Sequence, residues 1–337
     1  MIRTPDWWYK KDAKGAPWWR FVLWPLSLVW LFVNALKRRL AKPYRSDLFV
    51  ISIGNLTLGG SGKTPIAAEV LRLLGPDAIG LSRGHGGTLD GPLLVDPNVH
   101  TAAQVGDEPL MLAQAHDFVV AKDRALGLKL IETSNARIAV VDDAHQNLKV
   151  AKDLHILVVD GDTSNEGWPF GDGGICPDGP MREPFKDGLA RADLCVLWMP
   201  DETRLPAPEL LALLAPKPVF VARLTATRPD HLAHVLGFAG IAKPWKFEAT
   251  LRNLGYQVID FKAFPDHASF KDADLKAMQA TADAQLCDLF TTQKDWVRLD
   301  KNWRERVGYL PISARFDDEA GFKAVLRVAT EKHILGV

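Results

Sequence analysis

The sequence predicts an α/β fold: two Rossmann-like α/β/α domains joined by a two-strand β hinge, with a membrane-associated helix before them. Three observations predict this architecture. Apolar runs of strand length alternate with helical patterns from residue 41 onward, which is typical of parallel sheets covered on both faces. A glycine-rich loop ending in Gly62-Lys63-Thr64 lies between the first strand and the first helix. The stretch 18–36, ahead of both domains, is almost entirely apolar.

Length, composition and charge define the class of protein. The 337 residues suffice for two domains, and 47% hydrophobic with 24% charged residues is a globular composition. The formal net charge is zero, so no overall field favours nucleic acid, and we expect no nucleic-acid partner. The three cysteines are widely spaced and show neither a disulfide framework nor a metal motif. The patterns predict a membrane-associated helix at 1–40, a P-loop domain at 41–225, a smaller α/β domain at 226–306, and a return strand with a C-terminal helix at 307–337.

The amino-terminal segment combines tryptophans, an apolar helical pattern and positive charge. Six of the eleven tryptophans lie in the first thirty residues. The run 18–36 would form a helix roughly 28 Å long, about the thickness of a bilayer's hydrocarbon core. Pro25 is expected to bend or restart this helix. The absence of a small-residue cleavage site disfavours a signal peptide, and a buried core helix is the remaining soluble alternative.

A spanning helix and a helix lying in the membrane interface both suit this segment. Positive charge on both flanks, together with Arg20 and Pro25, favours embedding without a crossing. In either case the cluster Lys37-Arg38-Arg39 keeps the chain that follows on the cytoplasmic side.

The stretch 54–65 is the strongest functional signal. An apolar strand at 48–53 precedes it and a helical pattern at 66–74 follows, which is the context of a phosphate-binding loop. Lys63 can reach the outer phosphates of a nucleotide, and the Thr64 hydroxyl can ligate Mg²⁺. The usual pattern has a glycine five residues before the last loop glycine, where this chain has Thr57. The residues whose backbone N–H groups would cradle phosphate are Gly59, Gly60, Ser61 and Gly62.

Two further loops follow in chain order. A short strand at 78–81 ends in the glycine-rich loop 82–87, which contains Arg83 and should face the same crevice, because ligands bind at the carboxyl ends of parallel strands. A surface turn is the alternative for this loop. Asp107 and Glu108 open the next helix, where two carboxylates could equally serve as a cap for the helix dipole.

A carboxylate pair ends one of the central strands. A strand at 116–120 and a helix to residue 132 lead to the apolar strand 136–141, which Asp142-Asp143 closes. An apolar strand that ends in Asp presents a hard oxygen ligand to Mg²⁺ beside a phosphate loop. The next apolar strand, at 154–160, also ends in Asp.

The segment 161–188 breaks the alternating pattern, because it is rich in Gly and Pro and shows no periodicity. A loop of this length inside a compact domain is usually functional or disordered. It carries Arg182, which near a phosphate-binding crevice is a candidate to stabilise the negative charge of a phosphoryl group during its transfer. An arginine exposed to solvent on a loop is the alternative. Strands at 194–198 and 219–222 complete the first domain.

The remaining chain predicts a smaller β–α–β–α–β unit. We expect the segments 219–226 and 310–316 to cross between the domains as a two-strand hinge. His267 lies in a loop before a helix, and position alone gives it no role. The unit's predicted elements are strands at 235–239, 256–261 and 286–292 and helices at 245–254, 271–282 and about 318–332.

These motifs together resemble one family, the tetraacyldisaccharide 4′-kinases of Gram-negative bacteria, across nearly the whole chain. Thr57, which departs from the common phosphate-loop pattern, is the residue that this family uses. The resemblance rests on the tryptophan-rich start and on the stretches 54–65, 82–87, 105–109, 142–143, 179–184, 238–241, 265–267 and 291–295.

The resemblance implies transfer of the ATP γ-phosphate to the 4′-hydroxyl of tetraacyldisaccharide 1-phosphate, giving lipid IVA. It implies ATP and Mg²⁺ as cofactors, and a monomer at the cytoplasmic face of the inner membrane with a glycolipid substrate. Asp107 would accept the proton of the hydroxyl, and His267 would pair with Asp107 and tune its carboxylate. The other implied roles are Lys63 and Arg182 in catalysis, Thr64, Asp142, Asp143 and Glu183 on the metal, Gln146 on the nucleotide, and Asn55, Arg83 and Arg124 on the substrate.

The chain also departs from the family pattern. The Asp pair is followed by Ala144-His145-Gln146-Asn147, where only Gln146 keeps the family residue, so nucleotide positioning there is in question. His85 and the stretch 240–244 also differ. Two alternatives stay open: a membrane-tethered P-loop ATPase coupled to assembly or partner binding, and a nucleotide sensor without catalysis. Leu58 counts against the first, because regulatory ATPases of that class usually carry lysine there.

Overall fold

The computed structural model describes residues 5–12, 15–164, 166–226, 234–241 and 243–334. The predicted segments 1–40, 226–306 and 307–337, and residue 165 of the segment 41–225, therefore lie partly or wholly outside the described residues.

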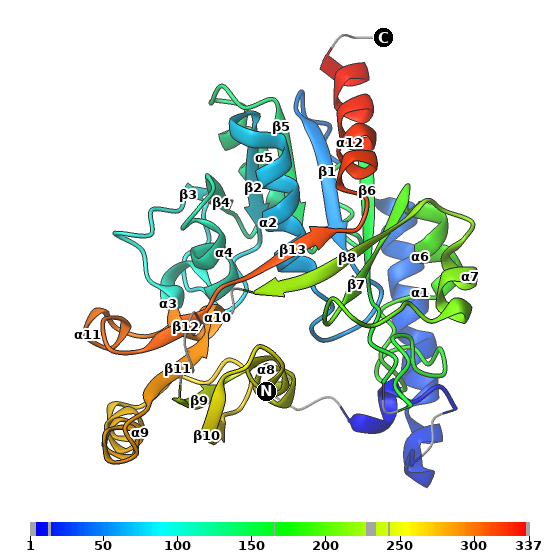
Figure 1. The fold of residues 1–337 in the computed structure, drawn as a ribbon. Coiled ribbons are helices and arrows are strands. Elements are labelled where there is room, and N and C mark those ends of the chain that lie inside the picture. Colours follow the sequence, from blue (N-terminus) through cyan, green and yellow to red (C-terminus); the bar gives the residue numbers. More distant parts are fainter. Residues whose placement is uncertain (1–4, 13–14, 165, 227–233, 242, 335–337) are drawn as a thin grey trace.

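Two sheets organise the described chain (Figure 1). The larger has nine strands in the order β13-β8-β7-β6-β1-β5-β2-β4-β3. All its neighbouring pairs are parallel except β13–β8 and β3–β4, at its two edges. Its strands are β1 (Phe49–Gly54), β2 (Ala78–Ser82), β3 (Leu93–Leu94), β4 (Phe118–Val120), β5 (Ile138–Asp142), β6 (Leu154–Asp160), β7 (Leu194–Met199), β8 (Val219–Ala226) and β13 (Ile312–Phe316).

Helices cover both faces of the larger sheet, because its central strands alternate apolar side chains between two cores. Phe49, Ile51 and Ile53 of β1 pack with α2 (Lys63–Leu74) and α12 (Glu319–Ile334). Leu48 and Val50 face the opposite side and pack with α5 (Arg124–Ile131). The remaining helices of this lobe are η3 (Gly75–Asp77), α3 (Ala102–Val105), α4 (Asp107–Leu112), α6 (Phe185–Arg191) and α7 (Pro208–Leu214).

The smaller sheet has four parallel strands in the order β10-β9-β11-β12, and lies beneath the larger one in Figure 1. One face of this sheet packs against α8 and the other against α9. We call this sheet with its helices the small lobe, and the larger sheet with its helices the large lobe. The elements of the small lobe are β9 (His234–Ala239), α8 (Pro244–Asn253), β10 (Gln257–Ala263), α9 (Asp272–Ala284), β11 (Asp288–Thr292), α10 (Gln293–Trp296), α11 (Lys301–Arg304) and β12 (Gly308–Leu310).

The connection between the lobes is the predicted pair of strands. β8 and β13 run antiparallel, with Ala226 opposite Ile312 and Ala222 opposite Phe316. Pro311 separates β12, in the small sheet, from β13, in the large one. This confirms the two-domain α/β fold with its hinge; the exact domain bounds stay a prediction.

The amino-terminal segment forms η1 (Asp6–Tyr9), η2 (Trp18–Val22) and α1 (Trp24–Leu40). Pro25 lies in the first turn of α1, so the helix restarts there, as expected. By length and composition the stretch Trp18–Leu40 could cross a membrane, and only 6% of its apolar window is buried. That exposure excludes the buried core helix. The exposed apolar side chains of this stretch include Trp18, Trp19, Phe21, Trp24, Leu26, Val29, Trp30 and Phe32.

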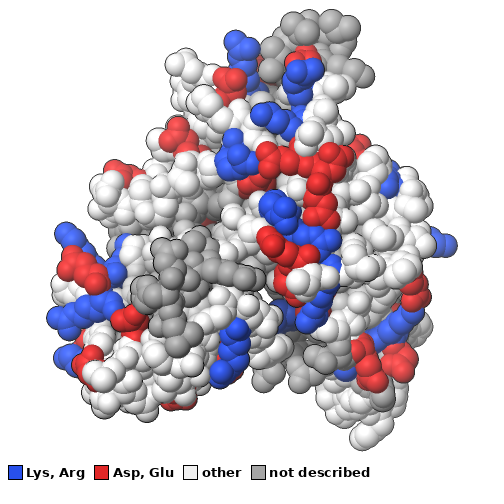
Figure 2. Space-filling view, viewed as in Figure 1, with Lys and Arg blue, Asp and Glu red and all other residues white. Residues whose placement is uncertain are grey.

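Charged side chains of both signs are interspersed over the face shown in Figure 2, over both lobes and around the hinge. This mixture agrees with the zero net charge of the chain.

Candidate active site

The phosphate loop joins β1 to α2 and has the backbone that its glycines permit. Gly62 has a φ of +81°, and an added Cβ would lie 2.4 Å from the ring of Trp198. Glycine is therefore required there by both conformation and space. Within the described chain, the first turn of α2 receives no hydrogen bond from a capping side chain. Its N–H groups and helix dipole thus remain available to phosphate oxygens.

The carboxylate pair after β5 lies beside this loop, as predicted. Lys63 Nζ is 3.6 Å from Asp143 Oδ1. Asp142 is buried, and its burial together with the nearby Glu108 carboxylate raises the pKa of Asp142 to about 7. Burial acts in the same direction on Asp143, but Lys63 and Arg182 outweigh it and hold the pKa of Asp143 below its usual value.

The predicted loop 161–188 is shorter in the structure, because α6 begins at Phe185, and this loop between β6 and α6 brings Arg182 to the same place. Its Nη1 donates to Asp143 Oδ1 at 2.8 Å, and its Nε donates to the carbonyl oxygen of Thr57 at 3.1 Å. One guanidinium thus spans the phosphate loop and the carboxylate pair. This geometry excludes the alternative of a freely solvated loop arginine.

Glu183, next to Arg182, is enclosed by side chains. Its carboxylate accepts hydrogen bonds from Arg191 at 2.6 Å and from Gln146 at 2.9 Å, and it also pairs with Arg38 of α1. Burial opposes ionisation, but these partners hold the pKa of Glu183 below its usual value. Glu183 would have to exchange some of these partners to ligate a metal, so the predicted metal role is not visible in this arrangement.

The segment 144–147, where the chain departs from the family, is well packed. Gln146 Nε2 donates to the carbonyl oxygen of Asn55 at 2.7 Å. His145 is buried, its Nε2 lies 3.0 Å from the carbonyl oxygen of Gly188, and its Cβ packs directly against Gly54. Burial lowers the pKa of His145 to about 4, so the ring is neutral near pH 7. The departure therefore leaves Gln146 in contact with the phosphate loop.

The three predicted substrate residues differ in their surroundings. Arg83 is exposed on the loop 82–87. Asn55 is buried, and its Oδ1 has no hydrogen-bond partner within the described residues. Arg124 is also buried, and its Nη2 donates to the carbonyl oxygens of Asp142 and Asp143 at 3.3 and 3.1 Å. Arg124 thus supports the backbone of the carboxylate pair.

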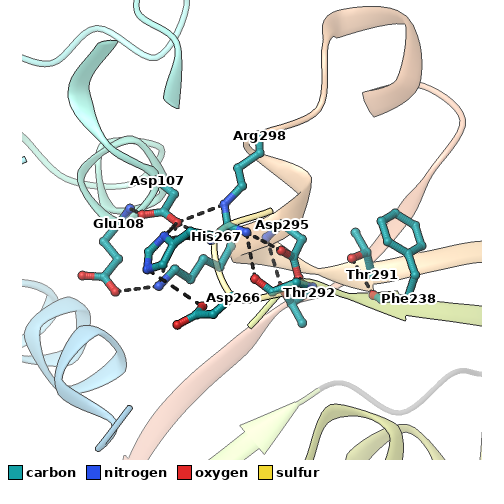
Figure 3. A network of polar contacts seen from close by, with 11 residues as sticks. Asp107, Glu108, Phe238, Asp266, His267, Thr291, Thr292, Asp295 and Arg298 are labelled. Atoms are coloured by element: carbon teal, nitrogen blue, oxygen red, sulfur yellow. Dashed lines mark hydrogen bonds and ion pairs between the residues drawn. The ribbon is translucent and has the colours of Figure 1, made fainter. Parts of the chain in front are cut away.

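A second cluster forms where the lobes meet, around Asp107 at the start of α4 (Figure 3). His267 Nδ1 lies 3.0 Å from Asp107 Oδ2, as the resemblance led us to expect. Arg298 Nε donates to the same oxygen at 3.0 Å, and Lys294 Nζ lies 3.8 Å from it. Lys294 also forms an ion pair of 2.9 Å with Glu108.

These partners decide the charge of Asp107. Burial alone would raise the pKa of its carboxyl, but the hydrogen bond from His267 and the charges of Lys294 and Arg298 hold the pKa well below its usual range. The side chain is therefore ionised at neutral pH.

Sequence reasoning missed Arg298 and gave Lys294 no role. Lys294 lies in the stretch 291–295 that carried the family resemblance, and this was the only available signal. Arg298 is 191 residues from Asp107 in the chain, so no local pattern could join them.

The oxygen donors beside the phosphate loop suit Mg²⁺. Among the described residues, no group of three or more His, Cys, Asp or Glu side chains is arranged to hold a metal. A protein set of Thr64, Asp142 and Asp143 would leave coordination positions for water and nucleotide phosphates, which is the usual manner of Mg²⁺ binding. A cation there would also offset the charge of these adjacent carboxylates, of which Asp142 is buried, so the residues present fit the ion.

A phosphate loop whose lysine faces paired strand-end carboxylates defines a P-loop nucleotide-binding protein. The family model described as tetraacyldisaccharide-1-P 4′-kinase matches residues 19–331. The chain belongs to this family, whose members are ATP-dependent kinases of lipid A biosynthesis.

Similar proteins cover nearly the full chain. The tetraacyldisaccharide 4′-kinase of Phenylobacterium zucineum is 46% identical over 325 residues, which is 96% of this chain and 98% of the relative. That of Caulobacter vibrioides is 48% identical over 331 residues, covering 97% and 98%. A crystal structure of LpxK from Aquifex aeolicus in complex with ATP superposes with a TM-score of 0.70 at 25% identity, covering 92% of this chain and 99% of that one. These findings confirm the family resemblance and leave the residue roles as proposals.

Proposed function

We propose that this protein transfers the γ-phosphate of ATP to the 4′-hydroxyl of tetraacyldisaccharide 1-phosphate, at the cytoplasmic face of the inner membrane. One observation carries the proposal. The start of α4 packs on the loop that follows β2, since an added Cβ at Gly106 would lie 2.7 Å from the carbonyl oxygen of His85, and β2 pairs with β5 in the sheet. The ionised Asp107 therefore lies at the same carboxyl edge of the sheet as the phosphate loop, where an acceptor hydroxyl must lie for in-line transfer.

The proposed chemistry assigns a separate task to each group. The hydroxyl oxygen attacks the γ-phosphorus, the bond from that phosphorus to the bridging oxygen breaks, and ADP leaves. Asp107 accepts the hydroxyl proton, and His267 tunes this carboxylate. Lys63 and Arg182 face the outer phosphates and balance the charge that develops on them. Mg²⁺, when bound, would neutralise phosphate charge further.

We assign the binding roles from the exposure and the hydrogen-bond partners of each side chain. Thr64, Asp142 and Asp143 would hold Mg²⁺, with Glu183 as a further ligand only if its ion pairs rearrange. The residues 59–62 and Gln146 would surround the nucleotide. Asn55 and Arg83 would contact the substrate, since Asn55 Oδ1 lacks a partner among the described residues and Arg83 is exposed. Arg124 would act indirectly, through the backbone of the carboxylate pair.

The amino-terminal helices would hold the monomeric protein at the lipid surface. Arg20 Nε donates to Asp178 Oδ1 at 2.8 Å, Ser27 Oγ donates to the carbonyl oxygen of Ile175 at 2.6 Å, and Trp30 Nε1 donates to the carbonyl oxygen of Arg182 at 3.0 Å. One side of this segment is thus held by the folded domain along its length, while its other side exposes apolar residues. This arrangement favours a helix embedded in the interface over one that crosses the bilayer.

The test is transfer of a label from the γ-phosphate of ATP to purified tetraacyldisaccharide 1-phosphate, in detergent with Mg²⁺, with Lys63→Ala beside the wild type. We expect labelled lipid from the wild type and none from the variant. ATP turnover that is independent of the glycolipid and lost in the variant would instead indicate a coupled ATPase. ATP binding with no turnover of either kind would indicate a nucleotide sensor.

A further inference from the structure

The guanidinium of Arg298 contacts both lobes, and each of its three nitrogens donates at least one hydrogen bond (Figure 3). Within the small lobe, Nη1 donates to Asp295 Oδ1 at 2.7 Å and to the carbonyl oxygen of Gly240 at 3.0 Å. Towards the large lobe, Nε donates to Asp107 Oδ2 at 3.0 Å, and Nη2 also donates to that oxygen. The Arg298 side chain is only 9% exposed, so water competes little with these bonds.

The small-lobe end of this bridge is itself rigid. Asp295 is fully buried, and its Oδ2 accepts hydrogen bonds from the backbone N–H of Gly240 at 3.0 Å and from the Thr292 hydroxyl at 2.7 Å. The carbonyl oxygen of Gly240 also accepts the backbone N–H of His267 at 3.0 Å. The same anchor therefore fixes Arg298 and the backbone of His267, and the two side chains reach Asp107 as one unit.

The two oxygens of Asp107 are used unequally. Oδ2 faces Arg298, His267 and, at 3.8 Å, Lys294. Among the described residues, Oδ1 accepts only the backbone N–H of Glu108, at 2.9 Å. A carboxylate oxygen has about two acceptor directions, so Oδ1 keeps one for a ligand.

We propose that Arg298 is a positioning residue for the kinase reaction: by holding Oδ2, it turns Oδ1 of Asp107 towards the acceptor hydroxyl once the small lobe is docked. This inference rests on the proposed function, in which Asp107 takes the hydroxyl proton. The proton then moves from the hydroxyl to Oδ1, while Arg298 keeps its bonds to Oδ2. Phosphoryl transfer depends more on positioning than on strong bases, so the loss of basicity caused by a neighbouring cation is tolerable.

Three variants separate position from charge. Arg298→Gln removes both the planar guanidinium and its charge, whereas Arg298→Lys keeps the charge without the planar group. Asp295→Asn leaves Arg298 in place but weakens the carboxylate that holds it. Arg252→Gln, which changes an exposed arginine of the same lobe, is the matched control. Each protein is assayed for kcat across pH, for KM of ATP and of the glycolipid, and for thermal stability.

We expect Arg298→Gln to lower kcat by about 10- to 100-fold, with KM for ATP unchanged, because the nucleotide site lies in the other lobe. The charged and titratable groups facing Asp107 are Glu108 on its own helix and Lys294, Arg298 and His267 from the small lobe. Removing one cation from this set raises the pKa of Asp107, so the acid limb of the kcat profile should move to higher pH. Arg298→Lys should lower kcat without moving that limb, and Asp295→Asn should lower kcat by a smaller factor.

An Arg298→Gln enzyme with wild-type kcat and an unmoved acid limb would overturn the inference. So would a loss of kcat that merely follows a loss of thermal stability in all three variants. The reference variant Asp107→Ala separates the two proposals: an inactive wild type, or a fully active Asp107→Ala enzyme, would refute the proposed function and with it this inference. An inactive Asp107→Ala enzyme beside a normal Arg298→Gln enzyme refutes only the positioning role.

Discussion

At the scale of single residues, the phosphate loop depends on a glycine that no other residue can replace. Gly62→Ala would force a left-handed backbone onto alanine, at about 1–2 kcal/mol, and press a methyl group into Trp198. We expect a lower melting temperature and at least tenfold weaker ATP binding, measured by calorimetry. Gly75→Ala, at the other end of α2, is the matched control: it also has a positive φ, but an added Cβ there meets no atom within 4 Å, so stability should fall while ATP binding stays. Equal ATP binding by the two variants would contradict this account.

Asp107 tests the reaction chemistry at the same scale. Asp107→Ala should reduce turnover by about 10²–10⁴-fold, the range expected for the loss of a general base. ATP binding should stay largely intact, since Asp107 lies at α4 and outside the phosphate loop. Steady-state rates with the glycolipid, beside ATP binding constants, give the comparison. Wild-type turnover in this variant would remove Asp107 from the mechanism.

At the scale of elements, local sequence patterns predicted most of the fold and the nucleotide side of the site. Strands such as β1 and β6 were found because buried parallel strands are continuous apolar runs. The phosphate loop and the pair Asp142-Asp143 were found because each is contiguous in sequence. The bonds of Glu183 to Arg38 and of Asp107 to Arg298 join residues 145 and 191 positions apart, so only the folded chain brings them together.

Helix α1 has one side that contacts the loop between β6 and α6 and an apolar side that is exposed. Trp30 Nε1 donates to the carbonyl oxygen of Arg182, the residue that reaches Asp143. Trp30→Phe keeps an aromatic side chain but removes the indole N–H donor, so turnover should fall about three- to tenfold, as for one hydrogen bond of about 1 kcal/mol. Binding to lipid vesicles should be unchanged. Trp24→Phe, at an exposed position of the same helix, is the control for turnover, and equal turnover by both variants would contradict a role of α1 in placing Arg182.

At the scale of the whole molecule, the contacts that join the lobes within the described residues include the β8–β13 pair, the cluster around Asp107, and ion pairs between α8 and the end of β6. In the third, Lys246 Nζ lies 2.7 Å from Asp162 Oδ2 and 3.6 Å from Asp160 Oδ2. Burial works against both charges, but the pairing raises the pKa of Lys246 and lowers that of Asp162 to about 2. These ion pairs therefore persist across the pH range in which the enzyme would work, and favour the closed arrangement of the lobes.

Reversing one charge of this contact should open the molecule. Lys246→Glu places a third carboxylate beside Asp160 and Asp162, and like charges at this distance repel. We expect a larger radius of gyration in small-angle X-ray scattering, after the detergent contribution is subtracted. Turnover should fall by about tenfold, which corresponds to ~1.4 kcal/mol in activation free energy. Adding Asp162→Lys to the same chain restores an ion pair with the new glutamate but removes the pair between Asp162 and Arg204, so it should recover part of both losses. Lys262→Glu, at an exposed lysine of the small lobe, should change neither quantity. If Lys246→Glu loses turnover without opening, or if the double variant recovers nothing, this contact does not hold the lobes together, and closure depends on the hinge and on the contacts around Asp107.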